Sequence, residues 1–288
     1  METNLPLTVR GRLLDLSRPR VMGILNATPD SFFAGSRAVG AEAVVRRARQ
    51  LVDEGADILD IGACSTRPGS EPVDEQEEWQ RLEPALQAVR SALPDVPLSI
   101  DTFRASVAQR SVSQFGADVI NDISGGELDP LMFPTVAELG VPYVLMHGGA
   151  QPSCLPPDLT DAPAVLAAVA RYLAGRLQQL YALGVADVIL DPGFGFGKTM
   201  DQNYALFAHL ADLRKAFPAT PLLVGISRKR MVWQLLGSTP DQALNGTTVL
   251  NTLALHSGAH LLRVHDVRQA VEAVGIVRKV CPNAESQI

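Results

Sequence analysis

Eight short runs of Val, Ile and Leu recur along the chain, and stretches with helical character separate them. The runs occupy residues 21–25, 58–61, 97–100, 118–120, 143–146, 187–190, 221–226 and 260–264. They are largely apolar throughout and do not alternate, which is typical of strands that helices cover on both faces. The pattern therefore predicts a parallel sheet wrapped by helices.

The stretches between the runs carry apolar residues at a helical period. Residues 41–54 place one set on a single face, and Gly55 then supplies a stop signal; the set is Val44, Val45, Ala48, Leu51 and Val52. In residues 161–184, Asp161 can cap a helix and Pro163 suits its first turn. The apolar stripe of this second helix is Leu166, Val169, Ala170, Leu173, Leu177 and Leu180. We expect both helices on the outside of the sheet, with their stripes in the core.

Strand and helix alternate along the whole chain, and no low-complexity linker interrupts them. This alternation favours the α/β fold class and a single closed (β/α)8 TIM barrel, with the active site at the carboxyl ends of the strands. The barrel is expected over residues 21–280. Residues 1–20 are then an N-terminal extension in which a hairpin is the candidate for closing the barrel bottom, and 281–288 are a tail. A doubly wound open sheet is the structural alternative.

Polar residues follow the apolar runs at their ends. In a (β/α)8 barrel these ends converge, so we expect side chains that are far apart in sequence to face one pocket. A single Asp or Asn at a strand end is more often a helix cap or a turn former, and we interpret Asp122 and Asp266 that way. The other polar residues at strand ends are Asn26, Ser65, Thr66, Arg67, Asp101, Asn121, His147, Asp191, Ser227, Arg228, Lys229, Arg263 and His265.

Composition narrows the class of protein. The chain has 288 residues, 47% of them hydrophobic, and its formal net charge of -6 gives no basic field for nucleic acid. The three cysteines lack paired spacing, no secretory signal precedes the first run, and no apolar stretch reaches membrane-spanning length. These features predict a soluble cytoplasmic protein that binds neither nucleic acid nor a membrane.

The strand-end residues divide by charge into two groups. Asp101, Asp191 and the Asn121 amide offer acceptors and donors for a flat heterocycle with ring N–H and amino groups. A cluster of cations in an acidic protein is explained by an anionic substrate portion such as a diphosphate; these cations are Arg67, Lys229, Arg263 and His265. The alternative is that each cation pairs with a barrel carboxylate, which we favour for Arg228 more than for Arg263.

The glycine-rich segment DPGFGFGKT, residues 191–199, matches neither common phosphate-binding pattern. Pro192 stands where a P-loop needs its first glycine, and the alternating glycines do not fit G-x-G-x-x-G. We therefore expect a glycine loop that allows close backbone approach, with Phe194 and Phe196 as pocket walls. His147 has no metal-ligand partner in spacing, and it is interpreted equally well as a structural or a functional histidine.

Seven segments resemble, in order and spacing, the motif series of the dihydropteroate synthases. The segments are ILNATPDSF, STRPGS, SIDTF, INDISGG, ILDPGFGFGKT, GISRKR and LLRVHDV, and together they span nearly the whole chain. The resemblance implies a transferase of folate biosynthesis. Such an enzyme condenses 6-hydroxymethyl-7,8-dihydropterin diphosphate with p-aminobenzoate to give 7,8-dihydropteroate and diphosphate.

The resemblance also implies roles for individual residues. It places the dihydropterin ring against Asp101, Asn121, Met146, Asp191, Gly225 and Lys229. It places the diphosphate at Asn26, Arg67, Arg263 and His265, with Mg²⁺ bridging the diphosphate oxygens and touching Asn26. The p-aminobenzoate pocket is expected to contain Thr66, Arg67, Pro68, Phe196 and Arg230, under loops 27–38 and 63–72 that close over the site. The resemblance further implies that catalysis depends on Asp101, Lys229, Arg263 and His265, and that the protein is a homodimer.

Three positions depart from the common pattern of this family. Phe33-Ala34-Gly35-Ser36 replaces Ser-Asp-Gly-Gly, Ala63-Cys64 replaces Gly-Glu, and Arg230 replaces Ser. Cys64 is interpreted as a packing thiol, whereas Arg230 either pairs with the carboxylate of p-aminobenzoate or points to solvent. Two alternatives remain: a catalytically silent pterin-binding paralogue, and a methyltetrahydrofolate corrinoid methyltransferase, which needs no diphosphate site.

Overall fold

Eight parallel strands form the centre of the molecule in the computed structural model, which describes residues 5, 7–9, 11–27, 37–63, 73–148 and 154–281. They are β3 (Arg20–Asn26), β4 (Ile58–Gly62), β5 (Leu98–Asp101), β6 (Val119–Asp122), β7 (Tyr143–Met146), β8 (Val188–Asp191), β9 (Leu223–Val224) and β10 (Leu261–Val264). Their order is β8-β7-β6-β5-β4-β3-β10-β9, and a bridge between Leu190 and Leu222 brings β8 beside β9. The barrel is therefore nearly closed, and each strand matches one predicted apolar run. The predicted TIM barrel is confirmed.

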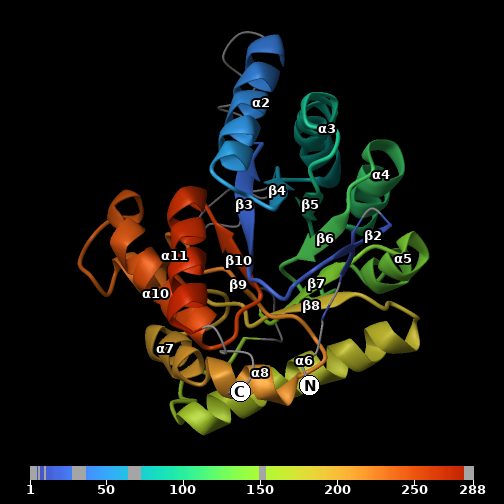
Figure 1. Ribbon diagram of the computed structural model, residues 1–288. Coiled ribbons are helices and arrows are strands. Elements are labelled where there is room, and N and C mark those ends of the chain that lie inside the picture. Colours follow the sequence, from blue (N-terminus) through green and yellow to red (C-terminus); the bar gives the residue numbers. More distant parts are fainter. Residues whose placement is uncertain are drawn as a thin grey trace.

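Helices form a ring around these strands (Figure 1). They are α2 (Arg37–Asp53), α3 (Glu75–Ala92), α4 (Ala105–Phe115), α5 (Met132–Leu139), α6 (Ala162–Ala182), α7 (Met200–Ala208), α8 (Leu210–Ala216), α9 (Arg230–Trp233), the 3-10 helix η1 (Pro240–Gln242), α10 (Leu244–His256) and α11 (Val267–Val280). Each barrel strand is followed by at least one of them, which is the alternation that the sequence predicts.

Local sequence explains where several helices begin and end. Asp161 caps α6 by accepting a hydrogen bond from a backbone N–H of the first turn at 2.9 Å, and Pro163 lies in that turn, as predicted. Gly55 follows α2 with a φ of 102°, which lets the chain turn back toward β4. In α7, Thr199 and Gln202 form a reciprocal capping box.

The apolar side chains of the strands divide between two layers. One set packs between the strands and the helix ring; it includes Val21, Leu59, Ile120, Leu145, Leu190 and Leu262. A second set fills the barrel interior near the amino ends of the strands, with Met22, Ile58, Val119, Val144, Ile189, Leu223 and Leu261. Adjacent strand residues point to opposite faces. Because both faces are buried, the runs are apolar at almost every position.

A hairpin covers the amino end of the barrel. Strands β1 (Leu7–Val9) and β2 (Arg12–Leu14) pair antiparallel. Leu7, Val9 and Leu16 are buried in the same cluster as the interior set of strand residues. The N–H of Thr8 donates to Asp187 Oδ2 at 3.0 Å, directly before β8. The apolar base and this hairpin leave the polar strand ends at the opposite end of the barrel. None of the helices in the described ranges has the length and apolarity needed to span a membrane.

Candidate active site at the barrel mouth

The strand register aligns three polar positions at the carboxyl ends of neighbouring strands. Asn26, the last residue of β3, lies opposite Gly62, which in turn lies opposite Asp101. Asp101 then pairs with Asn121 on β6. Asp191 ends β8, and Arg263 lies near the end of β10. These five polar residues, all in the described part of the chain, therefore share one end of the barrel.

Arg263 lies between two carboxylates inside the mouth. Its Nη2 donates to Asp101 Oδ2 at 2.5 Å and its Nε donates to Asp60 Oδ2 at 2.6 Å. The Asp60 side chain is fully buried, whereas Asp101 and Arg263 retain exposed fractions of 13% and 18%. The pairing with barrel carboxylates that we disfavoured for Arg263 is thus present. A guanidinium carries five N–H donors, so Arg263 also has donors to offer an anion.

Asp60 is a site residue that the sequence reasoning missed. It lies inside the second apolar run, ILDI, and its carboxylate accepts from Ser99 Oγ at 2.6 Å and from Asn121 Nδ2 at 3.2 Å in addition to Arg263. The sequence does contain a signal for Asp60, because an acidic residue within an otherwise apolar strand is seldom buried without polar partners.

Burial makes the carboxylates of the mouth hard to ionise together. It raises the pKa of Asp101 to about 7, with Arg263 opposing the shift and Asp60 adding to it. Burial also raises the pKa of Asp191 against the attraction of Lys229. For Arg263, burial would lower the pKa, but Asp60 and Asp101 raise it above its usual value. The positive charge of Arg263 is therefore permanent at neutral pH.

Lys229 is enclosed by the glycine loop that follows β8. Its Nζ donates to the carbonyl oxygen of Phe194 at 2.6 Å and lies 4.5 Å from the centroid of the Phe196 ring. Burial lowers the pKa of Lys229 to about 8, against the attraction of Asp191. Gly195 has a φ of 81°, and a Cβ there would lie 3.1 Å from Lys229 Cδ. The absence of a side chain at Gly195 thus lets the loop backbone approach the Lys229 side chain closely. The Phe194 ring does not wall the pocket, because it is fully buried in the core.

Lys198 is a second residue that the sequence reasoning missed. Its ammonium donates to three carbonyl oxygens, those of His147 at 3.1 Å, Gly193 at 2.9 Å and Phe196 at 3.1 Å. It therefore ties the end of β7 to both limbs of the glycine loop. His147 packs its ring edge against Tyr172, with centroids 4.8 Å apart, and burial lowers its pKa to about 3. A neutral, packed His147 favours the structural interpretation.

Two contacts join the segments after β9 and β10. Ser227 Oγ lies 3.1 Å from His265 Nδ1 and accepts from the His265 backbone N–H at 3.1 Å. Arg228 pairs with Asp266, as we favoured for this arginine. Arg228 is also the only described non-glycine residue with a positive φ, 56°. The two segments are therefore fixed together directly beside Lys229 and Arg263.

The remaining predicted residues differ in what the structure says of them. Thr66, Arg67 and Pro68, together with Ala34 and Cys64, lie outside the described residues, as does most of both covering loops. Met146 is buried at the end of β7. A Cβ at Gly225 would lie 3.7 Å from Arg263 Cβ and 3.8 Å from Asp191 Oδ2, so this glycine faces the charged cluster. The side chain of Asn26 is exposed, and Arg230 Nε donates to Gln234 Oε1 at 2.7 Å.

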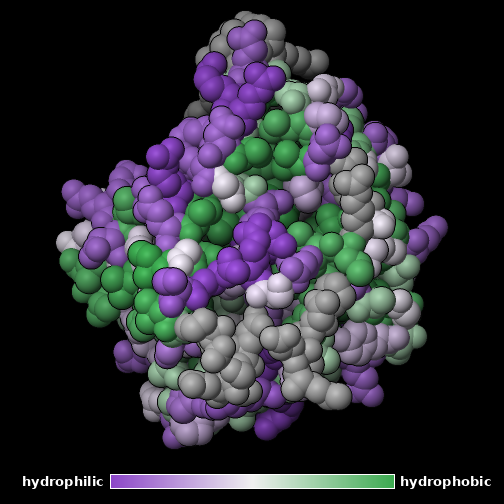
Figure 2. All heavy atoms as spheres, viewed as in Figure 1, coloured by the Kyte–Doolittle hydropathy of each residue, from purple (hydrophilic) through white to green (hydrophobic). Residues whose placement is uncertain are grey.

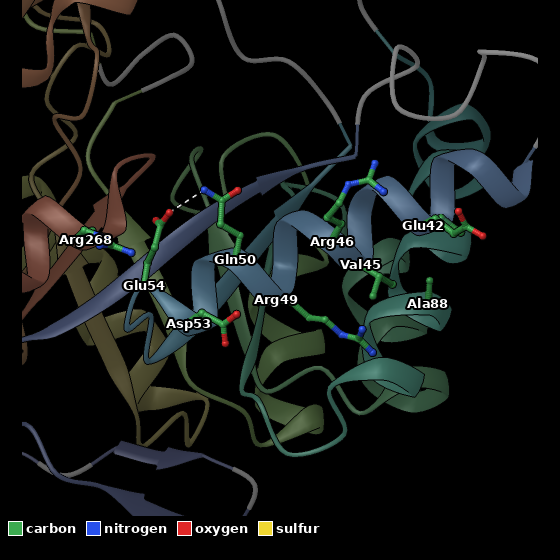
Figure 3. Close-up of a pocket in the computed structure, with 10 residues that line it drawn as sticks. Glu42, Val45, Arg46, Arg49, Gln50, Asp53, Glu54, Ala88 and Arg268 are labelled. Carbon is green, nitrogen blue, oxygen red and sulfur yellow. Dashed lines mark hydrogen bonds between the residues drawn. The ribbon is translucent and has the colours of Figure 1, made fainter.

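A separate hollow lies on the outer side of α2, away from the mouth (Figure 3). Its wall carries charges of both signs, and Gln50 and Glu54 are hydrogen-bonded at 2.7 Å within it. The lining residues come from α2, the residue that follows it, α3 and α11; they are Ala41, Glu42, Val45, Arg46, Arg49, Gln50, Asp53, Glu54, Ala88 and Arg268. None is a strand-end residue. The hollow is therefore separate from the candidate site at the barrel mouth.

Comparison with known proteins agrees with this geometry. A family described as pterin binding enzyme matches residues 22–265. The chain is 39% identical over 286 residues to a dihydropteroate synthase of Escherichia coli, and the match covers 98% of each chain. A Xanthomonas albilineans dihydropteroate synthase solved with 4-aminobenzoic acid superposes with a TM-score of 0.86 at 40% identity, covering 96% of this chain and 98% of the other. The same enzyme solved with 7,8-dihydropteroate gives a TM-score of 0.82 at 39% identity, with the same coverage. This chain therefore belongs to the pterin-binding enzyme family, within its dihydropteroate synthases, which are transferases.

Proposed function

We propose that the barrel mouth joins 6-hydroxymethyl-7,8-dihydropterin diphosphate to p-aminobenzoate, giving 7,8-dihydropteroate and diphosphate. The observation that carries the proposal is the arrangement around Arg263, where a permanent cation bonds to Asp101 on β5 and the buried polar side chains of Asn121 and Asp191 lie on β6 and β8. The solved relative with 4-aminobenzoic acid and the one with 7,8-dihydropteroate support the choice of second substrate and product.

In this proposal the dihydropterin ring lies in the depth of the mouth. Asp191 and Asn121 are nearly buried, as a group that recognises ring N–H and amino groups by hydrogen bonds must be. Lys229 supplies a donor to the ring carbonyl edge, and Met146 and Gly225 border the ring. Asp101 lies near the reacting methylene group, where its carboxylate stabilises developing positive charge.

The diphosphate is proposed to lie toward solvent, at Arg263, His265, Asn26 and Arg67. Arg263 keeps its charge because its pKa is raised, and His265 is oriented by its contact with Ser227. Together they stabilise negative charge on the leaving group as it departs, which is where catalysis is expected to act.

Mg²⁺ is proposed to accompany the diphosphate. Within the described residues, no group of three or more His, Cys, Asp or Glu is arranged to hold a metal ion by itself. The exposed amide oxygen of Asn26 is instead a single neutral ligand, which suits Mg²⁺ that retains water and phosphate oxygens. The residues therefore fit an ion that arrives with the substrate, and when bound it would neutralise diphosphate charge.

The proposed step is a displacement at the methylene carbon. The bond between this carbon and the diphosphate oxygen breaks largely before the bond to nitrogen forms, and the electron pair leaves with the diphosphate. The amine nitrogen of p-aminobenzoate then supplies its lone pair, and the proton that it loses passes to solvent. An aryl amine is already neutral at pH 7, so the step requires no strong general base, and orientation supplies much of the rate.

The p-aminobenzoate pocket is proposed above the pterin site, between Phe196, Arg230, Thr66, Arg67 and Pro68. Phe196 is half-buried beside Lys229, so its ring can contact the aryl group at the edge of the pterin site. The loops 27–38 and 63–72 complete and cover this pocket in the proposal.

We also propose a cytosolic homodimer. Exposed apolar side chains lie on α10 and α11 and in the segment after α9; they are Leu235, Leu236, Leu244, Val249, Leu253, Ile276 and Val280. Figure 2 shows apolar surface over α10. A second copy presents the same apolar face and can cover it symmetrically. Light scattering should give twice the monomer mass, and Val249→Glu with Leu253→Glu should shift it to the monomer.

The test of the reaction is dihydropteroate formation by the purified protein from dihydropterin diphosphate, p-aminobenzoate and Mg²⁺. Arg263→Ala should abolish product, whereas Arg46→Ala, on the outer side of α2, should leave the rate unchanged. Tight binding of the diphosphate substrate without product would identify a catalytically silent paralogue. Neither binding nor product would reject the assignment. If the protein were instead a corrinoid methyltransferase, Arg263→Ala should leave its affinity for methyltetrahydrofolate unchanged.

A further inference from the structure

Three hydrogen-bond donors converge on the fully buried carboxylate of Asp60, in the middle of β4. Ser99 Oγ donates to Oδ1 at 2.6 Å. Arg263 Nε and Asn121 Nδ2 both donate to Oδ2, at 2.6 Å and 3.2 Å. The three partners come from β5, β6 and β10, and two of them belong to the proposed substrate site. Asp60 thus joins the pterin side of the mouth to the diphosphate side.

The contact with Asp60 defines which way the Asn121 amide faces. A carboxylate oxygen that already accepts from a guanidinium has only acceptor capacity to offer. If the Asn121 amide were reversed, its carbonyl oxygen would face Asp60 Oδ2, and two acceptors would meet without a proton between them. The cost of such a buried mismatch is large. The amide nitrogen therefore faces Asp60, and the amide oxygen is turned away from it.

We infer that Asp60 is a positioning residue that selects the dihydropterin ring by fixing Asn121 as a hydrogen-bond acceptor. The inference rests on the proposed function. With its carbonyl oxygen turned from Asp60, Asn121 recognises an N–H or amino group of the ring and rejects a ring that offers an acceptor there. Because the same carboxylate oxygen fixes Arg263, ring recognition and diphosphate recognition share one anchor.

A purely structural role for Asp60 is the competing explanation, since a buried arginine needs a counter-charge. The two explanations differ in what they expect of Asn121. A structural role predicts that loss of Asp60 acts through stability or Arg263, independently of Asn121. A positioning role predicts that the effects of changing Asp60 and Asn121 are not additive.

The test uses calorimetric binding of 6-hydroxymethyl-7,8-dihydropterin, which lacks the diphosphate and so does not report on anion binding by Arg263. Asp60→Asn, whose new amide can both donate and accept, should weaken binding about tenfold, and Asn121→Ala should weaken it at least as much. In the Asn121→Ala background, Asp60→Asn should have almost no further effect. Ser99→Ala is the matched control, because it removes a partner of the other carboxylate oxygen, and it should change binding less than about twofold. The KM for p-aminobenzoate should stay constant in Asp60→Asn.

Equal binding by wild type and Asp60→Asn would overturn the inference while leaving the proposed function intact. The inference would also be overturned if Asp60→Asn weakened dihydropterin binding tenfold in the Asn121→Ala background as well. Failure of the wild type to bind the dihydropterin would overturn both. If Asp60→Asn does not fold, as judged by circular dichroism, Asp60→Ser carries the same expectations and the same outcomes.

Discussion

Arg228 and Asp266 form a bidentate ion pair across the ends of β9 and β10, with Nε to Oδ2 at 3.0 Å and Nη2 to Oδ1 at 2.6 Å. Arg228 adopts a φ of 56°, a conformation that is unfavourable for a residue with a side chain. The backbone turn there puts Lys229 beside the glycine loop. The ion pair therefore secures a strained turn that the proposed site requires.

Removing this pair should reveal the strain. Arg228→Ala loses the ion pair and keeps the strained φ, so we expect the free energy of unfolding to fall by about 1–2 kcal/mol, allowing for the partial exposure of the pair. Arg228→Gly also loses the pair but relieves the backbone, so it should be about 1 kcal/mol more stable than Arg228→Ala. Urea denaturation of the two variants measures the difference. Equal stability would show that the turn stores no strain.

Lys198 should control the glycine loop and, through it, binding of the dihydropterin diphosphate. Lys198→Met removes all three hydrogen bonds to carbonyl oxygens and should raise the KM for this substrate about tenfold. Hydrogen exchange in residues 193–197 should become faster. Lys215→Met, at a lysine whose side chain is 54% exposed, is the control and should alter neither quantity. An unchanged KM together with faster exchange would mean that loop order is not needed for binding.

The side-chain amide of Asn26 should determine the Mg²⁺ concentration that the enzyme needs for activity. Asn26→Ala removes the proposed ligand oxygen and should raise the Mg²⁺ concentration for half-maximal activity about tenfold, with little change in the KM for p-aminobenzoate. Asn26→Asp retains an oxygen and should need no more Mg²⁺ than the wild type. Activity titrated with Mg²⁺ after chelator treatment gives both values. Identical titration curves for all three proteins would exclude Asn26 as a ligand.

His260 should make stability depend on pH below neutrality. Its Nδ1 accepts from the Leu222 N–H at 3.1 Å, and burial lowers its pKa to about 4, with Arg214 acting in the same direction. The neutral ring is the folded form, so its contribution is complete above the unfolded pKa of about 6.5 and is lost as the pH falls toward the folded value. From about pH 7 to about pH 5, the wild type should lose about 2 kcal/mol more stability than His260→Asn. Urea denaturation at the two pH values tests this, and equal losses would contradict it.

Arg230 stands where the family commonly has Ser, and a substitution can decide whether it binds p-aminobenzoate or points to solvent. If its guanidinium pairs with the carboxylate of p-aminobenzoate, Arg230→Ser should raise the KM for this substrate about fivefold and leave the KM for dihydropterin diphosphate unchanged. Steady-state kinetics with each substrate varied in turn gives both constants. No change in either would mean that Arg230 serves only its surface contact with Gln234.

The sequence predicted the barrel well because each buried strand left an uninterrupted apolar run. Even β9, with only two residues in the ladder, was marked by the run at 221–226. The polar residues after the runs could be assigned to one end of the barrel by topology alone, without any distance.

Asp60 and Lys198 escaped this reasoning for different physical reasons. Asp60 lies within a strand, so its apolar neighbours made the segment look like an ordinary buried strand. Its hydrogen-bond partners also come from strands that are far away in sequence. Among the described residues, the three hydrogen bonds of the Lys198 ammonium all go to backbone carbonyl oxygens, and every residue type carries such an oxygen, so no sequence pattern indicates them. Similarly, no pattern could show that Arg263 bridges two carboxylates, because that depends on which strand residues point inward together.

The hairpin at the amino end of the barrel has a consequence for the order of events. Leu7, Val9 and Leu16 pack against the apolar side chains that fill the base of the barrel, so substrates enter and products leave the proposed site through the same open end. In the proposed site the pterin lies beneath the aryl amine. The dihydropterin diphosphate must then enter before p-aminobenzoate, because p-aminobenzoate bound first would block the path to the pterin site.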